Sequence, residues 1–80
     1  MSPTILRVGP YRVFFFSNEG HEPPHVHVQR ETKLAKLWIE PDVRLSSSSG
    51  FVASELRLIQ RIVEERRKEL ADAWHEFFGR

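Results

Sequence analysis

The order of apolar and polar positions divides the 80-residue chain into a strand-rich first part and a helical second part. Between residues 4 and 45, short segments rich in β-branched and aromatic residues alternate apolar with polar positions, which is typical of half-buried strands. The pattern is clearest in three segments: 11–17 (YRVFFFS), 25–30 (HVHVQR) and 34–40 (LAKLWIE). Segments 4–8 and 43–45 are candidates for additional edge strands.

The second part of the chain has the apolar period of a helix. From residue 53 to residue 78 no glycine or proline intervenes, and apolar residues recur at intervals of three, four or seven. The charged stretch 64–69 (EERRKE) interrupts the apolar stripe for more than one turn. A continuous helix would be about 37 Å long, whereas a domain of this size spans roughly 30 Å. We therefore expect the helix either to kink there or to extend beyond the domain.

These segments predict one α+β domain over residues 1–80. An antiparallel sheet of three to four strands, within residues 4–45, packs against a long C-terminal helix over 53–78. The serine-rich segment 46–50 (SSSSG) is interpreted as a flexible joint between the two parts.

The strand period also sorts side chains onto the two faces of the predicted sheet. One face is apolar and is expected to lie under the helix; it collects Val13, Phe15, Val26, Val28, Ala35, Leu37 and Ile39. The opposite face mixes aromatic, imidazole and charged groups; it collects Arg12, Phe14, Phe16, His25, His27, Lys36, Trp38 and Glu40. A face this aromatic indicates a binding surface for RNA, for a protein or for a second copy of the chain.

Net charge, cysteine content and the length of apolar segments limit which classes of function the chain can have. The net charge is +1, so any nucleic-acid binding must depend on a local patch rather than on overall charge. The absence of cysteine excludes disulfides, thiolate zinc sites and cysteine nucleophiles. No segment has the roughly 18 apolar residues of a membrane span, and the first residues lack the apolar core of a signal peptide. We expect a small cytoplasmic protein without a membrane partner.

Residues 21–25 (HEPPH) match the H-E-x-x-H motif of zinc metalloproteases. That motif depends on a helix that places both histidines on one face. Pro23 and Pro24 bias the residues before them toward extended backbone, so this interpretation is excluded. What remains is His25 and His27 on one face of a strand, with side-chain origins about 6.5 to 7 Å apart. That spacing suits two ligands of one metal or two acid/base groups on one substrate.

The residues leave three interpretations of the histidine pair open. His21, His25 and His27 are candidate ligands for a divalent metal such as zinc, with Glu19 or Glu22 supplying an oxygen. Alternatively, His25 and His27 are a general acid/base pair acting on RNA. In that case Arg12 or Lys36 steadies the phosphate, and aromatic side chains stack on bases: Phe14, Phe16 and Trp38. The third interpretation is a pair of structural or partner-contacting strand residues.

The end of the helix carries three aromatic residues, Trp74, Phe77 and Phe78. They either cover the domain's own sheet or form the docking surface for a partner. The partner would be a second small protein or a second copy of the chain. On that interpretation the chain is a non-enzymatic interaction domain.

Four segments together resemble DUF4160, a family of small bacterial proteins classed as a domain of unknown function. They are PTILRVGPYRVFFFSNEG, EPPHVHV, AKLWIEPDVRL and AWHEFFG, and the EPPHxHV motif at residues 22–28 is the most specific. The resemblance covers nearly the whole chain. It implies a partner-binding component of a toxin–antitoxin-like or regulatory two-gene module. It assigns no catalytic residue, although His25 and His27 are positions of the motif.

Overall fold

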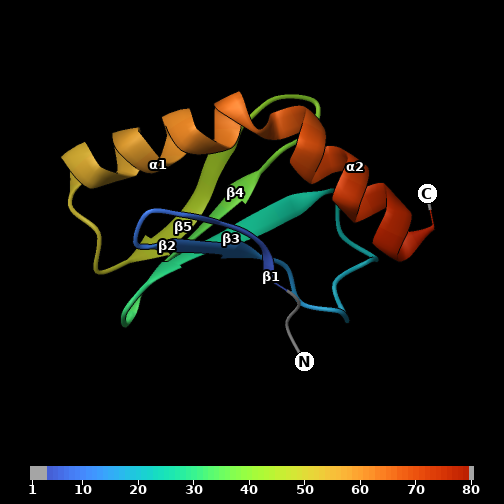
Figure 1. Ribbon diagram of the computed structural model, residues 1–80, viewed down its shortest axis with the longest axis horizontal. Helices are drawn as coiled ribbons and strands as arrows, with labels where there is room; N and C mark the ends of the chain where they lie inside the picture. The colour runs from blue at the N-terminus through green and yellow to red at the C-terminus, as the bar shows by residue number, and fades with distance from the viewer. Residues whose placement is uncertain (1–3, 80) are drawn as a thin grey trace.

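The computed structural model describes residues 4–79 as a five-stranded antiparallel sheet with two helices on one face (Figure 1). The strands are β1 (Thr4–Val8), β2 (Tyr11–Phe14), β3 (His25–Arg30), β4 (Lys33–Trp38) and β5 (Arg44–Ser49). They lie in the sheet in chain order, each antiparallel to its neighbour. The helices are α1 (Ala53–Glu65) and α2 (Arg67–Phe78). No helix in this described part is long and apolar enough to cross a membrane.

The predicted α+β class and the helix-covered antiparallel sheet are confirmed, but the expected three to four strands are five. The segment 46–50 is not a joint, because Ser47 pairs with Lys36 and Ser49 with Leu34 in the β4–β5 ladder. An edge strand is held by backbone hydrogen bonds and does not require apolar side chains. All six residues of β5 are exposed, so the serines satisfy the ladder without entering the core.

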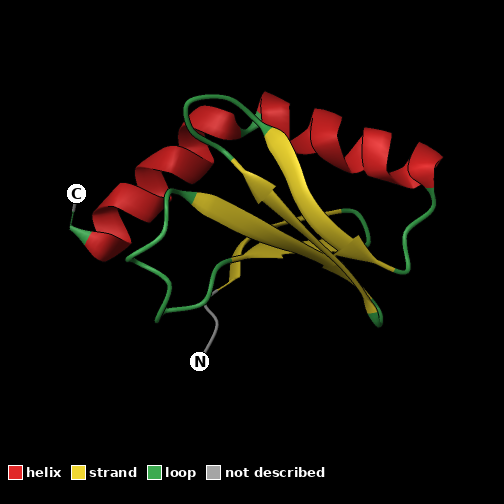
Figure 2. Cartoon of the chain, turned by 180° about the vertical axis from the view of Figure 1, so that it is seen from behind, coloured by secondary structure: helices red, strands yellow, loops and turns green. Residues whose placement is uncertain are grey.

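The single helix expected over 53–78 is two helices that meet at Arg66, whose backbone is not helical (φ −108°, ψ 13°). The break lies within the charged stretch 64–69, where a kink was one of the two expected outcomes. The longest dimension of the domain is 34 Å. Figure 2 shows the bend between the two helices, which both lie along the sheet. Their buried residues include Ile59 and Val63 of α1 and Leu70 of α2.

Strand register confirms the two predicted faces for the residues within β2, β3 and β4. The predicted faces also included Phe15, Phe16, Ile39 and Glu40, which lie beyond the strand ends and are not placed by register; Glu40 contacts His75 of α2 at 2.9 Å. Val13 lies opposite Val28, and Val28 lies opposite Ala35, which gives a row of the apolar face under the helices. Phe14 lies opposite His27 and His27 opposite Lys36, which gives a row of the other face. We call this second face the outer face. The loop over residues 15–24 leads into β3 and brings Glu19 to His25 and His27 and Glu22 to Lys36.

Polar contacts fix the helices on the sheet at two places. Glu55 in the first turn of α1 accepts hydrogen bonds from Tyr11 Oη (2.7 Å) and Arg30 Nη1 (2.6 Å). At the start of α2, Arg67 donates from Nε to the carbonyl of Ile39 (2.7 Å) and from Nη2 to that of Pro41 (2.8 Å). The Arg67 contacts hold the helix break against the end of β4.

We predict that Arg67→Ala lowers the free energy of unfolding by about 1 to 2 kcal/mol, because two carbonyl groups lose a charged donor. Urea denaturation measures the change. The matched control is Arg66→Ala, whose ion pair with Glu69 is exposed and which should change stability by less than about 0.5 kcal/mol. Equal losses in the two variants would contradict the anchoring role of Arg67.

Candidate functional site

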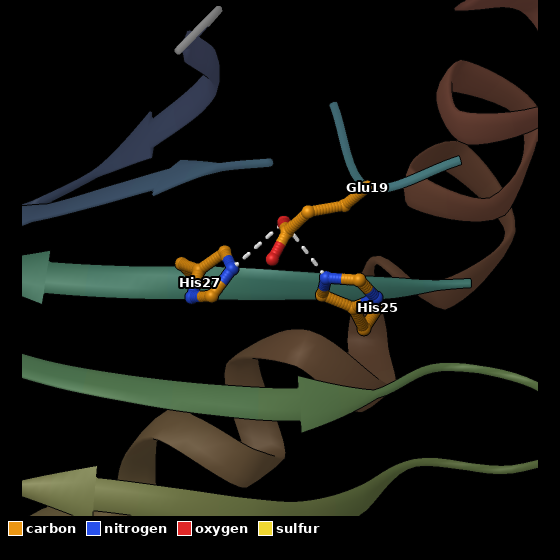
Figure 3. Close-up of side chains that lie close together, drawn as sticks. All are labelled: Glu19, His25 and His27. Atoms are coloured by element: carbon orange, nitrogen blue, oxygen red, sulfur yellow. Dashed lines mark hydrogen bonds and ion pairs between the residues drawn. The ribbon is translucent and has the colours of Figure 1, made fainter. Parts of the chain in front are cut away.

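Three side chains converge on the outer face at the beginning of β3 (Figure 3). Glu19 comes from the loop between β2 and β3, and His25 and His27 come from β3 itself. Glu19 Oε1 lies 2.9 Å from His25 Nε2 and 3.1 Å from His27 Nε2. One donor atom from each residue lies within 4.8 Å of the others. The exposed fractions of the side chains are 17% for Glu19, 0% for His25 and 8% for His27.

Local sequence explains why these groups meet. The two-residue period of β3 places both imidazoles on the same face. A turn over residues 16–19 directs the carboxylate back over the strand. In this turn the Phe16 N–H donates to Glu19 Oε1, and the Glu19 N–H donates to the Phe16 carbonyl, both at 3.2 Å. Glu19 Oε1 therefore faces three nitrogen atoms: one backbone amide and two imidazole nitrogens.

His25 faces a hydrogen-bond acceptor at both ring nitrogens. Nδ1 lies 2.9 Å from the carbonyl oxygen of Pro23, which can only accept, so Nδ1 carries a hydrogen. A neutral imidazole has one N–H, so a neutral His25 would direct its Nε2 lone pair at the Glu19 carboxylate. That contact at 2.9 Å is attractive only when Nε2 carries a proton or binds a cation. The two contacts therefore favour positive charge at Nε2, from a second proton or from a bound cation.

Electrostatics keep Glu19 ionised. Burial acts to raise the pKa of the Glu19 carboxyl, but the hydrogen bonds with His25 and His27 outweigh it, and the net pKa is lowered. Burial lowers the pKa of His27, and its hydrogen bond and attraction to Glu19 offset this only in part. His27 therefore favours the neutral ring and donates from Nε2–H to Glu19.

Aromatic rings enclose the two imidazoles. Phe14 stacks on His27 with ring centroids 5.4 Å apart, and Phe16 meets the same ring edge-on at 4.7 Å. His25 contacts Trp38 at 5.5 Å and Trp74 of α2 at 4.9 Å. This apolar shell fixes the orientation of both rings and strengthens charge interactions inside it.

The structure brings His25 and His27 together with Glu19, which was expected as an oxygen ligand, but not with His21. The expectation that His21 is a third ligand is wrong for this arrangement. Its side chain is 76% exposed, and its ring lies 3.9 Å from Glu22 instead of facing the cluster. The backbone of the loop turns residue 21 outward, whereas the turn at residues 16–19 turns Glu19 inward.

The other residues expected to bind RNA or a partner lie on the outer face. Arg12 places its guanidinium 4.3 Å from the centroid of Phe14 and donates to Gln29 at 3.1 Å. Lys36 pairs with Glu22 at 2.8 Å and lies 4.6 Å from the ring centroid of Trp38. Acid/base catalysis by the histidine pair stays a prediction, and the complete burial of His25 favours His27 as the residue that a substrate can reach.

The expectation that Trp74 forms a docking surface is wrong. Trp74 is 1% exposed, because it packs against His25 and against Phe15 inside the domain. Phe78 is half-buried and contacts Trp74 and Phe15. Phe77 remains 50% exposed. The aromatic end of α2 thus mainly closes the domain's own core, which was the alternative left open by the sequence.

Residues 11–75 match the model of a protein family described as a domain of unknown function, DUF4160. No curated protein and no solved structure matches the chain. The matched region includes the three clustered side chains, the aromatic rings around them and most of both helices. Because the match covers most of the sequence, the chain belongs to the DUF4160 family.

Proposed function

We propose that this protein is a metal-binding domain in which Glu19, His25 and His27 hold a divalent ion such as zinc. The observation that carries the proposal is the pair of acceptors around His25, the Pro23 carbonyl at Nδ1 and the Glu19 carboxylate at Nε2. A metal ion bound to Nε2 supplies the positive charge that this geometry favours. The same ion binds Glu19 and the Nε2 atom of His27.

The alternative source of positive charge is a second proton on His25. The ring would then be a fully buried cation paired with a carboxylate, and desolvation cancels much of the attraction in such pairs. A backbone carbonyl that holds Nδ1–H and leaves Nε2 for the metal is instead the usual arrangement around a metal-binding histidine. The Pro23 contact therefore supports the metal.

The distances are close to those of a coordination site. Zinc binds histidine nitrogen and carboxylate oxygen at about 2.0 to 2.2 Å, so tetrahedral angles place neighbouring ligand atoms roughly 3.4 Å apart. The observed Glu19–histidine separations are 2.9 and 3.1 Å. For an ion to enter, the carboxylate has to move outward, and the two imidazole nitrogens, which lie within 4.8 Å of each other, have to come within bonding distance of the ion. Three protein ligands leave a further position for water or a substrate.

The expected role in a toxin–antitoxin-like module, with RNA or a second small protein as partner, is a separate proposal. Phe77 and Phe16, which are 50% and 37% exposed, support a protein contact. The net charge of +1 gives no support to RNA binding by overall charge. The contacts around His25 are more specific than these features, so metal binding is the function that we infer.

We predict that protein produced without a histidine tag binds one equivalent of zinc per chain. Elemental analysis after dialysis measures it, and titration with Co²⁺ followed by visible absorption reports the coordination. Glu19→Gln, His25→Gln and His27→Gln should each weaken binding by at least about tenfold, because each removes a ligand of the ion.

The matched control is His21→Gln, which removes an exposed imidazole from the same loop and should leave zinc affinity unchanged. Circular dichroism of each variant verifies the fold, so that loss of metal is separated from loss of structure. Zinc binding that disappears in His21→Gln, or that persists in both β3 variants, would exclude the proposed ligand set.

We predict that the metal-free protein loses stability as pH falls from 7 to 4. The pKa of His27 is lowered on folding from its ordinary 6.5, so the unfolded chain takes up a proton first and stability declines below that pH. The pKa of Glu19 is lowered from its ordinary 4.5, so its contribution is lost at lower pH, as the folded carboxylate protonates. Thermal melts at a series of pH values measure both steps.

The variants His27→Gln and Glu19→Gln assign the two steps. His27→Gln should flatten the decline that begins near pH 6.5, and Glu19→Gln should reduce the decline below pH 4.5. A melting temperature that rises on acidification would show that the signs of the two pKa shifts are wrong.

A further inference from the structure

A groove of about 180 Å³ opens beside His27 on the sheet. Its walls come from β3, β4 and β5; they are His27, Leu34, Ala35, Lys36 and the serines at 47, 48 and 49. The row across the strands runs from His27 to Lys36 to Ser47, so small serine side chains stand where the neighbouring strands carry longer ones. Drug-sized ligands need pockets of about 300 Å³ or more, so this groove suits a small ion or molecule.

The second ring nitrogen of His27 is an unpaired polar atom at this groove. Nδ1 is buried and has no hydrogen-bond partner within residues 4–79, and the side chain is only 8% exposed. Figure 3 shows this nitrogen on the side of the ring that faces β4, away from Glu19. The groove lies on that same side, because β4 and β5 form its other walls. A buried polar atom without a partner is destabilising unless a ligand or water satisfies it.

Metal binding determines what this nitrogen can do, and this step rests on the proposed function. An imidazole that binds an ion through Nε2 carries its hydrogen on Nδ1. The metal-loaded protein thus directs an N–H donor toward the groove. Lys36 and Ser47 line the same groove, and an ammonium group and a hydroxyl can each donate hydrogen bonds. Three residues with hydrogen-bond donors around one groove favour a ligand rich in acceptors, although Lys36 already donates to Glu22.

We propose that this groove binds a small oxyanion, such as sulfate or a short carboxylate, and that metal at Glu19, His25 and His27 strengthens its binding. Lys36 is shared between the groove and Glu22, whose carboxylate lies 2.8 Å from Nζ. Glu22 therefore competes with the anion for the ammonium group. The coupling is reciprocal, so the anion raises metal affinity by the same factor.

The test is a nuclear magnetic resonance titration of ¹⁵N-labelled protein, with and without one equivalent of zinc, at constant ionic strength. Sodium sulfate and sodium acetate are titrated separately, which distinguishes a tetrahedral anion from a planar carboxylate. At least one should give saturable shifts at Ser47–Ser49 and at His27 Nδ1. Its affinity should be about tenfold higher in the zinc-loaded protein, because a charge-polarised donor is added.

Three variants locate the site. Lys36→Met should weaken anion binding by about tenfold, and Glu22→Gln should strengthen it because the competing carboxylate is removed. Lys33→Met is the matched control: it makes the same change of charge on the same strand, at a residue that does not line the groove, and should leave affinity unchanged. Ser47→Ala removes a hydroxyl from the groove without changing the charge. Because Ser47 lies on the exposed edge strand, the anion affinity of this variant tests the groove independently of charge.

Three results would overturn the inference. They are saturable shifts with neither anion, equal weakening by Lys33→Met and Lys36→Met, and equal affinity with and without zinc. The zinc content of the same sample separates this failure from that of the proposed function. Bound zinc without anion binding removes the oxyanion site alone, whereas failure to bind zinc removes both.

Discussion

The site depends on one carboxylate oxygen. Glu19 Oε1 contacts the imidazoles of His25 and His27 and accepts the backbone N–H of Phe16. These contacts tie the loop over residues 15–24 to the outer face of β3. They give both buried imidazoles a polar partner, while Trp74 of α2 covers part of the His25 ring.

The helices and the neighbouring aromatic side chains hold His25 and His27 in position. The break at Arg66 lets α2 bring Trp74 against His25, and the two carbonyl contacts of Arg67 hold the break at the end of β4. On the outer face, Phe14 fixes the plane of the His27 ring. The imidazoles are therefore positioned by packing before any ion or substrate arrives, which lowers the free-energy cost of ordering a binding site.

Local periodicity was enough to predict the two sheet faces, the shared face of His25 and His27, and a kink in the charged stretch of the helix. It was not enough for β5, because a serine edge strand is held by backbone hydrogen bonds that leave no apolar pattern. The choice between His21 and Glu19 depends on which way a loop turns. The contacts that decide it, such as the one between Phe16 and Glu19, become visible only in three dimensions. Helical period identified Trp74 as apolar but could not show that its neighbour is His25.

The most direct test of the central claim is the protonation state of His25, measured by ¹⁵N nuclear magnetic resonance in protein that has received one equivalent of zinc. The account predicts a hydrogen on Nδ1, held by the Pro23 carbonyl, and a metal-coordinated Nε2 without one. An imidazolium with hydrogens on both nitrogens in the zinc-treated protein would contradict it. The contact with Glu19 would then be a buried ion pair and not a metal site.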